Sequence, residues 1–287
     1  MNSLKVTVLM VALMVLFMFV GYMVGGQSGM VMAFVVAAIM NFITYWFSAK
    51  IVLAMYRARQ VTEKDHPRLF RVVHRVAAQA MMPVMPTVYI VPSRAPNAFA
   101  TGRDRDHAAV AVSEGLLELL TEDELEGVIG HEMAHILNRD MLVGTVAATF
   151  AGAIGILASI ARWGAIFGGG SSRDDNRGGA LGLLVAAIVA PLVAMIIQMA
   201  ISRQREYKAD AEGGRLTGKY LSLASALDKL HRSPVRMNLD DRPATAHLMI
   251  ANPLSGRGFT SLFSTHPPVE ARIERLRQLA QLAPYGG

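Results

Sequence analysis

His131-Glu132-Met133-Ala134-His135 is the stretch around which the fold and the chemistry of this 287-residue chain are organised. On a helix, His131 and His135 lie one turn apart on the same face, so both imidazoles can bind one metal ion. Glu132 points in another direction but stays within reach of a water molecule at the metal, where it can act as a general base. The pattern indicates a zinc-dependent hydrolase; two histidines in the core of an amphipathic helix are the alternative.

The residues before this stretch predict that it lies late in a helix. Thr121 is the expected N-cap, and Glu124, three residues later, completes a capping box. Apolar residues then recur at helical spacing, at Leu125, Val128, Ile129 and Leu137. The two histidines are therefore expected on one face of a capped helix.

A catalytic zinc ion usually has three protein ligands, so a third donor is needed. An HExxHxxGxxH site is excluded, because the chain has Asn138 and Met141 where that pattern requires glycine and histidine. Glu206 is the candidate, since it shares a helical face with Asp210, which can accept a hydrogen bond from the distal nitrogen of a ligand histidine. Taken alone, the two carboxylates would be assigned to a solvated face beside three basic residues, Arg203, Arg205 and Lys208.

Five segments together resemble the HtpX-type integral-membrane zinc metalloproteases, which are related to the prenyl-protein (CAAX) endopeptidases. These segments are residues 96–102, 109–120, 125–140, 202–210 and 265–268. They include the HExxH helix and a Glu-x-x-x-Asp helix. The resemblance implies a gluzincin-like catalytic domain with one Zn²⁺ per chain, held by His131, His135 and Glu206, with Asp210 behind a ligand histidine.

The resemblance also implies roles for residues outside these two helices. Asn97, Ala98 and Phe99 are the candidate edge strand that binds substrate, and an ordinary core strand is the alternative. His266 and Arg272 match the family pattern for catalytic donors that stabilise negative charge on the attacked carbonyl oxygen. Capping of the final helix is the alternative role for His266.

The composition favours a membrane protein, because 53% of the residues are hydrophobic, only 17% are charged, and the mean hydropathy is +0.36. Residues 6–24 contain no charge, and residues 30–49 contain few polar groups. Both segments are long enough to span a bilayer. The first is long for a signal peptide and leads directly into the second, so we predict a retained helical hairpin.

The basic residues predict the orientation of this hairpin. The turn at 25–29 is uncharged, whereas Lys5 precedes the first span and Lys50, Arg57 and Arg59 follow the second. The catalytic part is therefore expected on the cytoplasmic side, and the resemblance implies a multi-pass protein of the bacterial inner membrane. The net charge of +6 is assigned to residues that flank the bilayer. Nucleic acid is not an expected partner, because no basic stripe with interleaved aromatics accompanies the charge.

Two further apolar runs, at 141–160 and 180–202, predict a second hydrophobic hairpin inside the catalytic region. A shallow or buried hairpin is the alternative, because the linker at 162–179 carries three arginines. The predicted units are a transmembrane hairpin (1–50), a first catalytic part (51–140), the second hairpin (141–202) and a second catalytic part (203–287). The metal would then stand on the order of 10 Å from the membrane surface.

The catalytic part is expected to be α+β within a mainly helical integral-membrane protein. Asp65 is a candidate N-cap for a helix at about 67–81, and a final helix is expected at 268–282. Short β-rich runs at 87–91, 97–101 and 108–112 predict a small sheet beside the metal-binding helix. A strand at the edge of a cleft can bind an extended peptide through its main chain.

These observations predict a membrane-bound zinc endopeptidase that cleaves cytoplasmic regions of misfolded or damaged membrane proteins. The expected partners are polypeptide substrates and the lipid bilayer. A CAAX-type prenyl-protein endopeptidase and a non-proteolytic membrane chaperone or scaffold with a vestigial metal site are the alternatives. A scaffold would have no need for Glu132, and a prenyl-protein endopeptidase would be expected to carry more than four spans.

Overall fold

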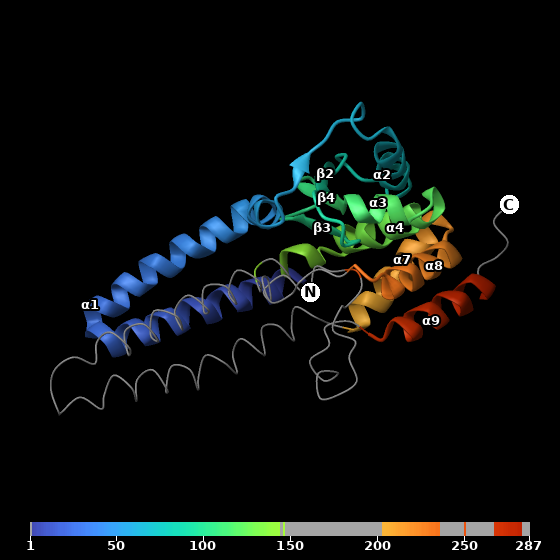
Figure 1. Ribbon diagram of the computed structural model, residues 1–287. Helices are drawn as coiled ribbons and strands as arrows, with labels where there is room; N and C mark the ends of the chain where they lie inside the picture. Colours follow the sequence, from blue (N-terminus) through green and yellow to red (C-terminus); the bar gives the residue numbers. More distant parts are fainter. Residues whose placement is uncertain (1, 144–145, 147–202, 236–249, 251–266, 283–287) are drawn as a thin grey trace.

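The computed structural model describes residues 2–143, 146, 203–235, 250 and 267–282. It is mainly helical, with a small sheet in the catalytic part and a long helical hairpin that projects from it (Figure 1). This is the predicted fold class. Apart from residues 141–143 and 146, the predicted second hydrophobic hairpin lies outside the described residues, and so does His266.

The hairpin is formed by α1 (Asn2–Met55), whose helical course is interrupted at Gly25 and Gly26. Gly26 has φ +59°, a conformation that glycine adopts without the steric cost a side chain would impose. Val6–Met23 and Gly25–Met55 are long and apolar enough to cross a membrane. Only 22% and 17% of their most apolar windows are buried, so these are not the core helices of a soluble domain. The two apolar helices of the predicted hairpin are present, and their retention in a bilayer stays a prediction.

The sheet contains β1 (Arg59–Gln60), β2 (Thr87–Val91), β3 (Ala98–Gly102) and β4 (Ala108–Ser113) in the order β1-β2-β4-β3. β2 and β4 are parallel, and the other two pairs are antiparallel. The three predicted strands are present to within one residue at their ends, and β1 was not predicted. Among the described strands, β3 lies at one edge of the sheet.

The first helix of the catalytic part, α2 (Pro67–Gln79), packs Leu69, Val72, Val73, Val76 and Ala77 into the core. The prediction that Asp65 caps this helix is wrong, because the N-cap is His66 and carries no side-chain hydrogen bond. The Asp65 carboxylate instead accepts hydrogen bonds from the backbone N–H and the hydroxyl of Thr62. An aspartate two residues before a helix can equally close a local turn, which is what happens here.

The HExxH stretch lies in α4 (Glu122–Asn138), which follows the short helix α3 (Glu114–Leu119). The predicted capping box is confirmed: the Thr121 hydroxyl accepts from the N–H of Glu124, and the Glu124 carboxylate accepts from the N–H of Thr121. The helix ends at Arg139, whose φ of 57° is left-handed.

Helix α4 is the centre of the catalytic part (Figure 1). It packs on β3 and α2 on one side and on α7 (Arg203–Thr217) and α8 (Tyr220–Arg232) on the other. The last helix, α9 (Val269–Leu282), lies against α8 and α7. One core of buried apolar residues joins α2, the sheet, α4, α8 and α9. His131, Glu132 and His135 therefore lie on the central helix, and Glu206 lies on α7, which packs against it.

Candidate active site

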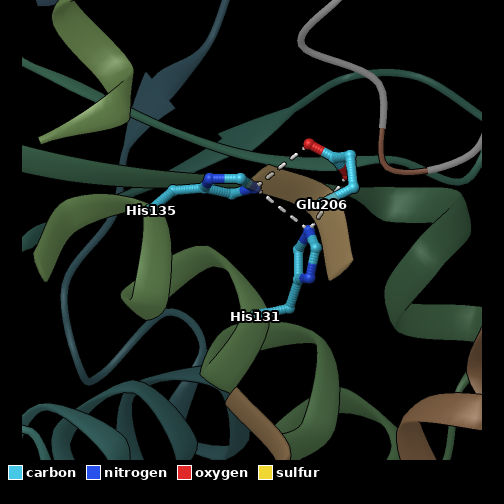
Figure 2. A group of neighbouring side chains, drawn as sticks. All are labelled: His131, His135 and Glu206. Carbon is cyan, nitrogen blue, oxygen red and sulfur yellow. Dashed lines mark hydrogen bonds and ion pairs between the residues drawn. The ribbon is translucent and has the colours of Figure 1, made fainter. Parts of the chain in front are cut away.

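Three side chains converge between α4 and α7: His131, His135 and Glu206 (Figure 2). The two Nε2 atoms lie 3.2 Å apart. Glu206 Oε2 lies 3.7 Å from His131 Nε2, and Glu206 Oε1 lies 3.5 Å from His135 Nε2. Ligands bound at about 2.0–2.2 Å to a tetrahedral zinc ion are roughly 3.3 Å from one another, so the three donors fit such an ion.

Facing glycines on α4 and α7 make this convergence possible. A Cβ on Gly213 of α7 would lie 2.6 Å from the backbone nitrogen of His131, and one on Gly130 would lie 2.9 Å from the carbonyl oxygen of Gly213. Real Cβ atoms essentially never approach backbone so closely. The two helix backbones are thus nearly in contact beside the histidines, and this contact brings the side chain of Glu206 within reach of both.

Asp210 supports His131 from behind. Its Oδ1 lies 2.9 Å from His131 Nδ1, the ring nitrogen that faces away from Glu206. Arg272 of α9 donates from Nε and Nη2 to the two oxygens of Asp210, at 2.7 Å each, and its side chain is fully buried. Burial would raise the pKa of Asp210, but Arg272 and His131 outweigh it and hold the pKa below its ordinary value. Asp210 is therefore an anion that fixes the orientation of His131.

Asp140 occupies the corresponding position behind His135. Its Oδ2 lies 3.2 Å from His135 Nδ1, and its Oδ1 lies 3.8 Å from Arg205. Burial would lower the pKa of His135, but the hydrogen bond to Asp140 and the charges of Glu206 and Glu132 raise it to about 9. The sequence analysis gave Asp140 no role at the site, so it missed this contact.

Asn138 has a structural role at the end of α4. Its side-chain amide donates to the carbonyl of Ala134 and to Glu212, and its oxygen accepts from Lys208. These contacts fasten the end of α4 to α7. No sequence signal separates Asn138 from Asp140, because both lie just after the motif and only the course of the chain after α4 decides which one faces a histidine.

Glu132 lies beneath β3 with its side chain buried. Its Oε2 accepts a hydrogen bond of 2.8 Å from the backbone N–H of Ala100. Burial raises the pKa of Glu132, although the nearby His131 and His135 oppose the shift. A carboxylate with a raised pKa is suited to accept and return a proton near neutral pH.

The edge of β3 that faces away from β4 lies above this carboxylate. Asn97 and Ser113 are joined by two hydrogen bonds: the Ser113 N–H donates to the Asn97 carbonyl, and the Asn97 N–H donates to the Ser113 hydroxyl. In an antiparallel pair this pattern repeats at every second residue, so the N–H and carbonyl groups of Phe99 and Thr101 also point towards β4. The peptide groups of Ala98 and Ala100 consequently face away from β4, as the bond from Ala100 to Glu132 shows. The Phe99 ring packs on Tyr56 at the end of α1, with 4.8 Å between ring centroids.

Two predicted site residues that are far apart in sequence hydrogen-bond to the main chain of the same residue, Ile250. Asn97 Oδ1 accepts a hydrogen bond of 3.1 Å from the N–H of Ile250, and Arg272 Nη1 donates one of 2.8 Å to the carbonyl of Ile250. Arg272 also lies 3.7 Å from Glu206. The side chains of Asn97 and Arg272 can thus hold both polar groups of an extended main chain.

The comparisons with known proteins agree with one another. The model of peptidase family M48 matches residues 63–280. A protease HtpX homolog of Syntrophobacter fumaroxidans is 54% identical over 281 residues, covering 96% of this chain and 98% of that protein. One of Thermococcus kodakarensis is 52% identical over 282 residues, covering 97% and 96%.

The crystal structure of S. mikatae Ste24p resembles this chain with a TM-score of 0.50 at 19% sequence identity. The similarity covers 84% of this chain and 57% of the Ste24p chain. At that identity the likeness concerns the fold alone.

Proposed function

Because this chain belongs to peptidase family M48 and is a membrane-bound metalloprotease, we propose that it is a zinc endopeptidase whose metal is held by His131, His135 and Glu206. The single observation that carries this proposal is the convergence of two imidazoles and one carboxylate at mutual distances of 3.2 to 3.7 Å. The donor set, two nitrogens and one oxygen, suits zinc and leaves a fourth position for water.

The metal and Glu132 have separate tasks in the proposed reaction. Zinc at this site supplies Lewis acidity, which acidifies water and polarises the scissile carbonyl. Glu132 removes the proton from the attacking water and later returns it to the leaving amine. The N–H of Ala100 holds the carboxylate in place, and burial favours its protonated form during the interval between the two transfers.

The proposed substrate is an extended polypeptide that pairs with the edge of β3 that faces away from β4. The N–H and carbonyl of Ala98 and the carbonyl of Ala100 are directed outwards for such pairing. The bonds from Asn97 and Arg272 to Ile250 support a role for both side chains in holding main chain. Phe99 contributes by packing on Tyr56, which keeps the strand in position.

For Arg272 we propose a role that differs from the predicted one of donating to the carbonyl oxygen under attack. Arg272 already donates from two nitrogens to Asp210 and from the third to a main-chain carbonyl. In this proposal Arg272 orients Asp210 and binds peptide rather than contacting the reacting oxygen. His266 keeps the donor role that the resemblance implies.

We further propose that the substrates are cytoplasmic regions of misfolded or damaged proteins of the bacterial inner membrane. The exposed apolar side chains of α1 support insertion of the hairpin, and Tyr56 at its end contacts Phe99 of the proposed substrate strand. The proposed substrate strand therefore lies beside the end of the hairpin. Equal cleavage of soluble and membrane-anchored substrates by the enzyme in liposomes would contradict this preference.

The experiment that tests the catalytic assignment compares Glu132→Gln with Glu206→Ala in the purified full chain. We expect Glu132→Gln to bind zinc like the unchanged protein but to cleave casein about 10³-fold more slowly, since general-base catalysis contributes on the order of 10²–10⁴. Glu206→Ala should lose both zinc and cleavage. Metal analysis and a fluorescent casein assay, with and without chelator, provide the measurements.

Glu118→Gln serves as the control, because Glu118 is exposed on α3 away from the site. Full proteolysis by Glu132→Gln would remove Glu132 from its role, and zinc retention by Glu206→Ala would remove Glu206 from the ligand set. A scaffold with a vestigial site would show no chelator-sensitive cleavage in the unchanged protein.

A further inference from the structure

The two metal-facing histidines are supported in the same way from opposite sides. His131 is backed by Asp210, which is held by Arg272. His135 is backed by Asp140, which faces Arg205. We infer that Asp140, with Arg205 behind it, is a positioning residue that orients His135 for the metal as Asp210 orients His131. This inference rests on the proposed metal site.

The first argument is the hydrogen-bond geometry of His135. An imidazole that binds a metal through Nε2 keeps its proton on Nδ1, and an acceptor at Nδ1 fixes both the tautomer and the plane of the ring. Asp140 Oδ2 lies 3.2 Å from His135 Nδ1, while His135 Nε2 points to His131 and Glu206. The ring therefore has its acceptor on one side and the proposed ligands on the other.

The second argument is the position of Asp140, which is nearly buried and close to Arg205. Its side chain is 10% exposed and lies 3.8 Å from Arg205, whose side chain is 14% exposed. The Arg205 guanidinium is close enough to attract the Asp140 carboxylate and so helps to hold it beside His135.

Asp210 is held more tightly by its arginine than Asp140 is. Arg272 binds Asp210 with two bonds of 2.7 Å inside the protein, whereas Arg205 lies 3.8 Å from Asp140 and the His135 side chain is 17% exposed. The support of His135 is looser and more solvated. Loss of Asp140 should therefore weaken the metal site without preventing folding, which makes Asp140 the better residue for an experiment.

The experiment measures metal binding directly in the detergent-solubilised full chain. Zinc affinity is determined by competition with a chromophoric chelator for Asp140→Ala, Asp140→Asn and the unchanged protein. We expect a 10- to 100-fold lower affinity for Asp140→Ala, the usual effect of losing such an outer partner. Asp140→Asn keeps an acceptor for the Nδ1 proton, so its zinc affinity should fall less, by on the order of tenfold or below.

Glu212→Gln is the matched control, because Glu212 also fastens the end of α4 to α7, through Asn138, but contacts no histidine. It should bind zinc like the unchanged protein. Substitution of Co²⁺ adds a spectroscopic reading: the visible absorption bands should shift in Asp140→Ala, where the ring is free to turn, and stay in place in Glu212→Gln.

The outcomes separate the inference from the proposed function. If the unchanged protein binds neither metal, the proposed metal site itself fails. If the unchanged protein binds zinc and Asp140→Ala binds it equally tightly, or Glu212→Gln loses as much affinity, Asp140 only fastens the helix and the inference is overturned. Should Asp140→Ala not fold, the affinity and Co²⁺ spectrum of Asp140→Asn decide in the same way.

Discussion

Two helix pairs in this protein approach each other through glycine, with different consequences. In α1, a Cβ on Gly21 would lie 2.5 Å both from the Cβ of Ala33 and from the carbonyl oxygen of Gly29, across the hairpin turn. In the catalytic part, Gly213 of α7 contacts the backbone of α4 beside His131. Small residues allow close approach in both places. In α1 the contact shapes a hairpin, whereas between α4 and α7 it sets the distances between proposed metal ligands.

The effect of a steric change at each glycine contact depends on which residues lie next to that contact. The arms of α1 are joined by a short turn, and their exposed faces carry apolar side chains that can adjust to a small displacement. The α4–α7 contact lies next to His131 and Glu206, and a metal site tolerates ligand displacements of only about 0.2 Å. The same glycine-to-alanine substitution should therefore have a larger effect at the α4–α7 contact than at the contact within α1.

The largest effect is expected from Gly213→Ala. In an exposed helix this change would add about 1 kcal/mol of stability, because alanine is the better helix former. Here the new Cβ meets the backbone of His131 at 2.6 Å, so α7 must move away and carry Glu206 with it. Zinc affinity should fall on the order of 100-fold, by analogy with lost supporting contacts at metal sites. Chelator competition provides the measurement.

Arg215→Ala, an exposed change on the same helix, is the control and should bind zinc normally. Unchanged zinc affinity in Gly213→Ala would show that the helices can separate without disturbing the ligands.

A smaller effect, confined to stability, is expected from Gly21→Ala. Overpacking of a tight contact costs about 1–3 kcal/mol, which should lower the unfolding temperature in detergent. Zinc content should stay at the level of the unchanged protein. Gly25→Ala is the matched control, because a Cβ there would have no atom within 4 Å. If Gly21→Ala lost its metal, the hairpin and the site would be coupled and the contrast between the two contacts would fail.

The smallest effect is expected from Glu124→Gln at the start of α4, which tests how much of that helix depends on its cap. Burial would raise the pKa of Glu124, but hydrogen bonds from Lys229, Ser225 and Thr121 outweigh it and hold the pKa below the ordinary 4.5. A lowered folded-state pKa means that the ionised form stabilises the fold. This stabilisation is complete well above pH 4.5 and disappears as the pH falls through the folded-state pKa.

At pH 7, Glu124→Gln should therefore reduce the free energy of unfolding by about 1 kcal/mol, in line with losses of other helix caps. The difference should shrink at pH values below the folded-state pKa. Thermal unfolding followed by circular dichroism at both pH values tests this, with Glu118→Gln as an exposed control. A difference that does not change with pH would assign the effect to packing rather than to charge.

Local patterns in the sequence were sufficient for much of the fold. Thr121 and Glu124 lie three residues apart and cap the same turn, and the three predicted strands are short β-rich runs between turns. Length and composition alone were enough to predict the two apolar helices of α1. The prediction failed at Asp65, where two local hydrogen-bonding patterns compete with similar energies.

The sequence by itself determined that His131 and His135 share a helical face, because positions i and i+4 are neighbours on any α-helix. A resemblance was needed to choose Glu206. Only the tertiary structure decided that Asp140 stands behind His135, that Ala100 holds Glu132, and that β3 is an edge strand. The contact of Ala100 with Glu132 and the place of β3 in the sheet depend on how elements far apart in sequence pack, and the position of Asp140 depends on the course of the chain after α4. No local pattern in the sequence fixes these relations.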